Sequence, residues 1–211
     1  QFGYSGFSNT QFYHFDVSES DNDIMLAGAQ DNGINRRSGF TTIFNHVASG
    51  DGYTCRFNHN TTGPAYFAIN RRVYKTDAAF TTYAQTGAAN IPDDWYKTIA
   101  ISYFNNGIVY TSSGSIYKTT NGGIGWTNMG GSGRWALITC PSNSNRVYAS
   151  GGDEWNDAGT QLNKKLQRSD DEGDNWTDLQ ENPGFPETIT KITGIAVDPA
   201  NSNRVWVTMG G

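Results

Sequence analysis

The sequence predicts an all-β protein, a β-propeller assembled from repeated units of four short strands. Three observations lead to this prediction. A hairpin-turn pattern recurs along the chain, a second strand–turn–strand repeat recurs out of step with it, and no stretch shows a sustained 3.6-residue periodicity. The last observation predicts essentially no α-helix. The composition agrees, because 25 glycines and only 17% charged residues suit many short strands joined by turns.

The hairpin-turn pattern is clearest in SDDEGDNWTDL, and TTNGGIGW repeats it. Both copies have the spacing of the Asp-box, S-x-D-x-G-x-x-W, a β-hairpin signature found in one group of β-propellers. KTDAAFTTY and RRSGFTTIF are weaker copies. The residues at the four pattern positions of the two clear copies are Ser169, Asp171, Gly173 and Trp176, and Thr119, Asn121, Gly123 and Trp126.

Each residue type in this pattern has a structural task in a tight turn. The Asp or Asn side chain accepts backbone N–H groups that the chain reversal leaves free, and Gly supplies a positive φ. The Trp is expected to fold back and cover the apolar underside of the hairpin. Asp171 is therefore predicted to be structural rather than catalytic. A calcium site in the acidic run 170–174 is an alternative, although the run lacks the D-x-[DN]-x-[DN]-G order.

The second repeat joins two strands through a polar turn, as in ITCPSNSNRVYAS and IAVDPANSNRVWVTM. Its copies are aligned by taking as equivalent positions Ile24, Tyr66, Val109, Val147 and Val205. The intervals are 42, 43, 38 and 58 residues, which is one propeller blade per interval, with SGGDEWNDAGTQLNKK as an insertion in the last. We expect a single propeller segment over 1–211 with blade repeats near 10–50, 51–90, 91–130, 131–185 and 186–211.

The five repeats predict an incomplete propeller. The chain stops at VTMGG, after a strand and before the hairpin that should follow it. A propeller closes on itself, and an open one exposes strand edges that pair with other chains. We therefore expect this segment to belong to a larger parent chain, the remainder of which is one of its partners.

Composition and residue spacing exclude several classes of function. The net charge of −5 with scattered Lys and Arg argues against a nucleic-acid partner. The sequence contains no run of 18 apolar residues, so no membrane span is predicted. Cys55 and Cys140 fall in non-adjacent blades and are predicted to be free, buried thiols. His14, His46 and His59 lack the spacing of a zinc site, so neither a metal nor another cofactor is expected.

Three phrases in the first quarter of the chain carry a family resemblance: TQFYHFDV at 10–17, GAQDNG at 28–33 and SGDGYT at 49–54. With Asp-box turns downstream, the chain resembles large secreted propeller proteins of the Bacteroidota, of the sialidase-like, sortilin-like and xyloglucanase-like kinds. Many of these are exported by the type IX secretion system. The resemblance implies a secreted or cell-surface protein, and its sortilin-like branch implies a peptide receptor.

Two of these phrases also have a physical interpretation. Loops on one face of a propeller converge on its axis, where ligands bind, and both phrases are Gly-flanked polar loops at strand ends. We therefore predict a shared polar binding patch formed by Gln30, Asp31, Asn32 and Asp51. The alternative is that these residues only stabilise turns.

An enzymatic interpretation requires a pair of carboxylates. Glycosidases place two of them about 5–10 Å apart, and the weak candidates here are Asp31, Asp51 and Asp77. Asp77 in KTDAAF is similar to the R-T-D phrase that carries a catalytic Asp in the xyloglucanase family, although that family has Gly-Gly where this chain has Ala-Ala. In that family the second carboxylate comes from a second propeller, which this segment does not contain.

A sialidase would instead need a cluster of three arginines. The adjacent Arg36 and Arg37 lie on one predicted strand and would face opposite sides of it, which disfavours that alternative.

The insertion at 150–165 favours a binding module. It places Trp155 among acids and amides, a mixture suited to stacking on a sugar ring or docking a protein, although a long surface loop is the alternative. The predicted function is an extracellular, non-catalytic propeller that binds protein or polysaccharide on a bacterial surface. The alternative is a propeller glycoside hydrolase acting on a polysaccharide.

Overall fold

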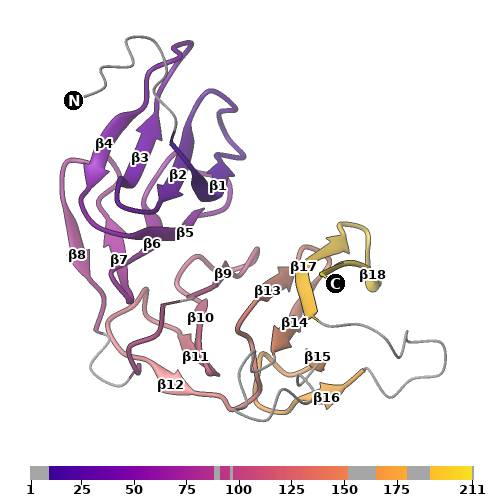
Figure 1. The fold of residues 1–211 in the computed structure, drawn as a ribbon. Helices are drawn as coiled ribbons and strands as arrows, with labels where there is room; N and C mark the ends of the chain where they lie inside the picture. The colour runs from indigo at the N-terminus through magenta and orange to yellow at the C-terminus, as the bar shows by residue number, and fades with distance from the viewer. Residues whose placement is uncertain (1–9, 88–90, 96, 152–164, 180–190, 211) are drawn as a thin grey trace.

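The computed structural model describes residues 10–87, 91–95, 97–151, 165–179 and 191–210. All regular secondary structure within these ranges is β-strand. The strands form five antiparallel sheets, which follow one another in chain order (Figure 1). The prediction of an all-β fold is confirmed, since the described residues contain no α-helix. It follows that none of them belongs to a helix that could cross a membrane.

The sheets contain the following strands. The first has β1 (Phe12–Val17), β2 (Met25–Ala29), β3 (Gly33–Arg37) and β4 (Asn45–Ala48). The second has β5 (Gly52–Phe57), β6 (Ala65–Ile69), β7 (Arg72–Thr76) and β8 (Tyr83–Gln85). The third has β9 (Ile99–Ile101), β10 (Val109–Ser113), β11 (Ser115–Thr119) and β12 (Thr127–Asn128). The fourth has β13 (Ala136–Cys140), β14 (Asn143–Gly151), β15 (Lys165–Ser169) and β16 (Thr177–Asp178), and the fifth has β17 (Lys191–Asp198) and β18 (Asn201–Gly210).

The sheets are arranged as the blades of a partial β-propeller. Within each four-stranded sheet the strands pair in sequence order. The first strand of each sheet packs against the first strand of the next, so that β1 contacts β5, β5 contacts β9, β9 contacts β13 and β13 contacts β17. Figure 1 shows the five sheets following one another along an arc. The first strands therefore lie innermost, nearest the axis of the arc.

Strand pairing corrects the repeat alignment proposed from the sequence. Val17 pairs with Met25, and Phe57 pairs with Ala65. The matching pairs in the later sheets involve Val109, Val147 and Val205 as expected. The first two copies are therefore aligned at Met25 and Ala65 rather than at Ile24 and Tyr66. Their looser sequences hid these two shifts of one residue, which run in opposite directions.

The hydrophobic core lies between neighbouring sheets, as a set of separate layers. Three tyrosines, Tyr66, Tyr110 and Tyr148, are at most 2% exposed in these layers. The Tyr110 hydroxyl donates to the backbone carbonyl of Glu172 at 3.0 Å, and the Tyr148 hydroxyl to that of Ser202 at 2.8 Å. Each bond runs from one sheet to the next, so the inter-sheet layers are fixed by polar as well as apolar contacts.

The turns at 119–126 and 169–176 have matching hydrogen bonds. Ser169 Oγ accepts the backbone N–H of Gly173 at 2.7 Å, and Asp171 Oδ1 accepts that of Asn175 at 2.8 Å. In the other turn the same bonds run from Gly123 N to Thr119 Oγ1 at 3.0 Å and from Gly125 N to Asn121 Oδ1 at 3.0 Å. Hydrogen bonds from Asn175 and Ser169 lower the pKa of Asp171.

The tryptophans of these turns contribute to the layer shared with the preceding sheet. Trp126 packs with Tyr66 and Val73 of the second sheet. Trp176 packs with Tyr110 of the third, and its indole N–H donates to the carbonyl of Met129 at 3.1 Å. The ring therefore joins two sheets instead of covering its own hairpin alone.

The two cysteines are buried and form no disulfide, as expected from the sequence. Cys55 lies in β5 and Cys140 ends β13. Burial raises the pKa of both thiols, that of Cys140 to about 11. Neither thiol is therefore poised to act as a nucleophile near neutral pH.

Candidate functional site

The innermost strands have two ends, and each end carries a different group of polar and aromatic side chains. In the first sheet, Phe12 at the start of β1 pairs with Ala29 at the end of β2. Val17 at the end of β1 pairs with Met25 at the start of β2. We call these the β2–β3 end and the β1–β2 end. The same alternation holds in the second sheet, where Gly52 pairs with Ile69 and Phe57 with Ala65.

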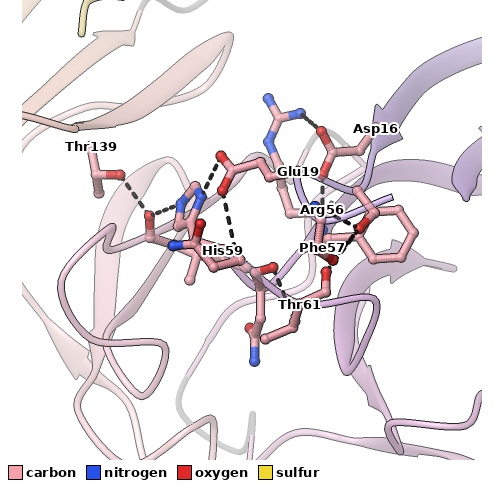
Figure 2. A network of polar contacts seen from close by, with 12 residues as sticks. Asp16, Glu19, Arg56, Phe57, His59, Thr61 and Thr139 are labelled. Atoms are coloured by element: carbon pink, nitrogen blue, oxygen red, sulfur yellow. Dashed lines mark hydrogen bonds and ion pairs between the residues drawn. The ribbon is translucent and has the colours of Figure 1, made fainter. Parts of the chain in front are cut away.

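The β1–β2 end contains a cavity of about 210 Å³ between the innermost strands of four sheets. Asp16, Arg56 and Phe57 line it at the ends of β1 and β5 (Figure 2). Asp16 accepts the backbone N–H of Phe57 at 2.8 Å and pairs with Arg56 Nη1 at 3.2 Å. Burial raises the pKa of Asp16, and the neighbouring Arg56 opposes that shift.

A chain of hydrogen bonds crosses this cavity and joins all four sheets (Figure 2). His59 Nδ1 lies 2.9 Å from Glu19 Oε1, and His59 Nε2 lies 2.9 Å from the carbonyl oxygen of Ile101. The Thr139 hydroxyl donates to the same carbonyl at 2.6 Å, while the ring of Tyr103 stacks on His59 at 3.7 Å. The carboxylates of this cavity are therefore held by bonds between sheets, and the arrangement serves to fix the innermost strands.

The β2–β3 end carries a row of three aromatic rings. Tyr13 stacks on Tyr53 with ring centroids 5.3 Å apart and planes 13° apart. Tyr53 meets Trp95 edge-on with centroids 6.5 Å apart. Tyr13 is 44% exposed and Trp95 is 43% exposed. We call Tyr13, Tyr53 and Trp95 the aromatic row. It spans the first three sheets, and Tyr13 and Trp95 face solvent while Tyr53 packs partly against the core.

The predicted polar patch lies at this same end. The Tyr13 hydroxyl donates to Gln30 Oε1, and Asp51 Oδ1 accepts the backbone N–H of Asp31 at 3.1 Å. Asp31 and Asn32 also line a hollow of about 660 Å³ on the first sheet. The structure thus places Gln30, Asp31, Asn32 and Asp51 together, beside the aromatic row.

Asp77 lies away from the other two carboxylates that were weak catalytic candidates. Asp77 directly follows Thr76, the last residue of β7. The Thr76 hydroxyl accepts the backbone N–H of Ala65, the first residue of β6, so Asp77 lies at the β1–β2 end. Asp77 accepts the backbone N–H of Thr81 at 2.8 Å as well as the Thr81 hydroxyl, and these bonds lower its pKa. Its carboxylate is occupied by its own turn.

Sequence reasoning missed the aromatic row, although a signal for it was present. Aromatic residues stand at Tyr13, Tyr53, Trp95 and Trp135, at intervals of 40, 42 and 40 residues. Trp135 immediately precedes β13 and so occupies the corresponding place in the fourth sheet. An aromatic residue that recurs once per blade and is partly exposed to solvent indicates a repeated surface position rather than a core position.

Trp155, the remaining predicted binding residue, lies outside the described residues. The strands on either side of it, β14 and β15, pair at Gly151 and Lys165. No group of three or more His, Cys, Asp or Glu side chains in the described ranges is placed to hold a metal ion.

Comparison with known proteins relates this chain to solved structures only. No protein-family model matches the sequence, and no curated protein matches it. Its fold is similar to that of an ancestral GH74 enzyme, with a TM-score of 0.71 and 13% identity over 95% of this chain. It is also similar to the GH74 xyloglucanase of Xanthomonas campestris, with a TM-score of 0.70 and 17% identity over 95% of this chain.

These likenesses concern the propeller fold. The matched regions cover 27% of the ancestral enzyme and 35% of the xyloglucanase, so this chain spans about a quarter to a third of the length of each. At such low identity, activity has to be argued from the residues of this chain.

Proposed function

We propose that this chain is a glycan-binding β-propeller module that contacts its ligand through the aromatic row. The observation that carries the proposal is the placement of Tyr13, Tyr53 and Trp95 side by side at one end of three adjacent sheets, with Tyr13 44% and Trp95 43% exposed. Aromatic faces pack against the apolar faces of sugar rings, and ligand sites combine such surfaces with a few placed polar groups.

The three rings of the row support one another. Tyr13 and Tyr53 stand on the innermost strands β1 and β5 and stack, while Trp95 lies four residues before β9 and meets Tyr53 edge-on. A surface that is ordered before binding loses little side-chain entropy when the ligand arrives. Gln30, Asp31 and Asp51 supply hydrogen-bonding groups for sugar hydroxyls next to the rings.

Affinity electrophoresis in gels that contain polysaccharides tests this proposal, with Trp95→Ala as the test variant. We expect retention of the wild type on at least one polysaccharide and a loss of about tenfold or more in affinity for Trp95→Ala, since a stacked aromatic contact contributes roughly 1–3 kcal/mol where it has been measured on planar rings. The matched control is Phe104→Ala, because Phe104 is 58% exposed and lies in the loop between β9 and β10, at the β1–β2 end. Equal losses in both variants, or binding only to a protein partner, would overturn the proposal.

A glycoside hydrolase is the second candidate. It is supported by the proximity of Asp31 and Asp51 and by the GH74 enzymes among the structural neighbours. Asp51 is partly engaged, since it accepts the Asp31 N–H and its own N–H donates to Asn70 Oδ1 at 2.9 Å. Release of reducing sugar by the wild type, lost in Asp31→Asn and Asp51→Asn with glycan retention unchanged, would establish the enzyme in place of the binding module.

We further propose that the module works outside the cell, at a bacterial surface. Support comes from the phrases at 10–17, 28–33 and 49–54, which resemble secreted propeller proteins. Brief protease treatment of intact cells tests this, because a surface protein is cleaved while a cytoplasmic marker is spared. Protection equal to that of the marker would refute an external location.

A further inference from the structure

The β6–β7 hairpin places an arginine in a backbone conformation that favours glycine. Asn70 and Arg71 are the two residues between β6 and β7, and both have positive φ, 47° and 70°. The β10–β11 hairpin has Gly114 in this region, and the β2–β3 hairpin has Asp31 and Gly33 there. A residue with a Cβ is strained in this region, and such strain is concentrated at ligand sites.

The side chain of Arg71 lies against the aromatic row. Its guanidinium carbon is 3.7 Å from the ring centroid of Trp95. Arg71 forms no ion pair with any described residue, whereas the adjacent Arg72 lies 3.7 Å from Asp93 and donates to Gln85 at 3.3 Å. A guanidinium stacked on a ring keeps the N–H groups along its edge available for a planar anion.

Arg71 also lines a cavity that begins beside the row. This cavity has a volume of about 380 Å³ and lies between the second and third sheets. Its cationic side chains are Arg71, Arg72 and Lys97, against the lining carboxylate of Asp93 and that of the neighbouring Asp94, which also acts on Lys97. Lys97 is 3% exposed and donates to the carbonyl of Pro92 at 2.9 Å. The volume lies within the range of small-molecule sites, about 300–1,000 Å³, and a local excess of positive charge favours an anion.

We propose that this cavity binds a carboxylate-bearing sugar of an acidic polysaccharide, with Arg71 as the residue that pairs with the carboxylate. The inference rests on the glycan-binding function proposed above and specifies its ligand class. The planar fork of Arg matches a carboxylate through two parallel hydrogen bonds. Neighbouring sugars of the same chain would lie on Trp95, Tyr53 and Tyr13, because Arg71 joins the cavity to the row.

Matched pairs of oligosaccharides test the proposal by isothermal titration calorimetry. The probes are oligogalacturonate, oligoglucuronate and alginate oligosaccharides, each compared with the same oligosaccharide after reduction of its carboxyl groups to neutral alcohols. We expect the wild type to bind at least one acidic member tenfold or more tightly than its reduced partner. Equal affinity within every pair would overturn the proposal.

The variant Arg71→Gly separates ligand binding from folding. Glycine is the residue that suits a φ of 70°, so the variant is expected to melt no lower than the wild type. It should lose the preference for the acidic oligosaccharide while keeping its affinity for the reduced one. Arg71→Asn is a second variant compatible with this turn and should behave alike. An unchanged preference in both variants would contradict the assignment of Arg71.

Two controls distinguish the failure of this inference from the failure of the proposed function. Arg204→Gln removes the same charge from the β17–β18 sheet and should leave every affinity unchanged. Tyr53→Ala should weaken acidic and reduced oligosaccharides alike. Binding of reduced oligosaccharides that depends on Tyr53 but shows no acidic preference would refute the role of Arg71 alone, and absence of all binding would refute both.

Discussion

The ring of Tyr13 stacks on the ring of Tyr53, with centroids 5.3 Å apart, although the two residues belong to different sheets. The contact exists because each residue lies four positions before the end of its innermost strand, and these strands, β1 and β5, pack side by side. The propeller fold thus converts a repeat in the sequence into a continuous surface.

The close contact between the first two sheets depends on a glycine. A Cβ added at Gly28 would lie 1.9 Å from the carbonyl oxygen of Tyr53, which is backbone and has no rotamer to change. Gly28→Ala is therefore expected to lower the free energy of unfolding by about 1–3 kcal/mol or more, as overpacked cores do, and to displace Tyr53. Thermal unfolding and glycan retention measure both effects. Gly125→Ala is the control, since its nearest atom is 3.8 Å away; equal melting temperatures for the two variants would count against this explanation.

The hydroxyl residue that ends the strand before each Asp- or Asn-containing turn is expected to stabilise the fold. Thr119 is 1% exposed, and its Oγ1 accepts the N–H of Gly123 at 3.0 Å. Thr119→Val keeps the shape but removes the acceptor, so it should reduce the free energy of unfolding by about 1–3 kcal/mol, the cost of a buried unpaired group. Urea unfolding gives the value. Thr119→Ser retains the hydroxyl and should lose less; a reversed order would show that packing, not the hydrogen bond, matters here.

Acid is expected to destabilise the fold through His14. Burial, with a smaller contribution from Arg56, lowers the pKa of His14 from 6.5 to about 3. Between these values the unfolded chain binds a proton that the folded chain does not, so the stability present above pH 6.5 is lost as the pH falls towards 3. The variant His14→Gln cannot take up this proton. Its free energy of unfolding should therefore fall less than that of the wild type between pH 7 and pH 4, and parallel pH profiles would contradict this account.

The sequence predicted the fold well because the repeat itself encodes it. Strand-forming runs and turn residues at fixed spacing specify hairpins locally, and the match of one copy to another supplies the period of the blade. The one-residue error at Ile24 and Tyr66 arose where the copies are least alike, since strand register depends on partners that lie elsewhere in the sequence.

The candidate site was predicted only in part, for a physical reason. Gln30, Asp31, Asn32 and Asp51 were found together because loops at one end of a propeller converge. Asp77 lies at the opposite end from Asp31, which the assignment of KTDAAFTTY as a copy of the Asp-box turn could have indicated. The position of Arg71 was also hidden, because its strained backbone and its contact with Trp95 arise only from tertiary packing.

Hydroxyl-radical footprinting with and without a bound oligosaccharide tests the central claim most directly, because it reports which side chains the ligand covers. Tyr13, Tyr53 and Trp95 should be protected, while Phe104 at the β1–β2 end and Trp206 on β18, which is 56% exposed, should react unchanged. Protection of Phe104 or Trp206 with the aromatic row left reactive would contradict the proposal that the row is the glycan-binding surface.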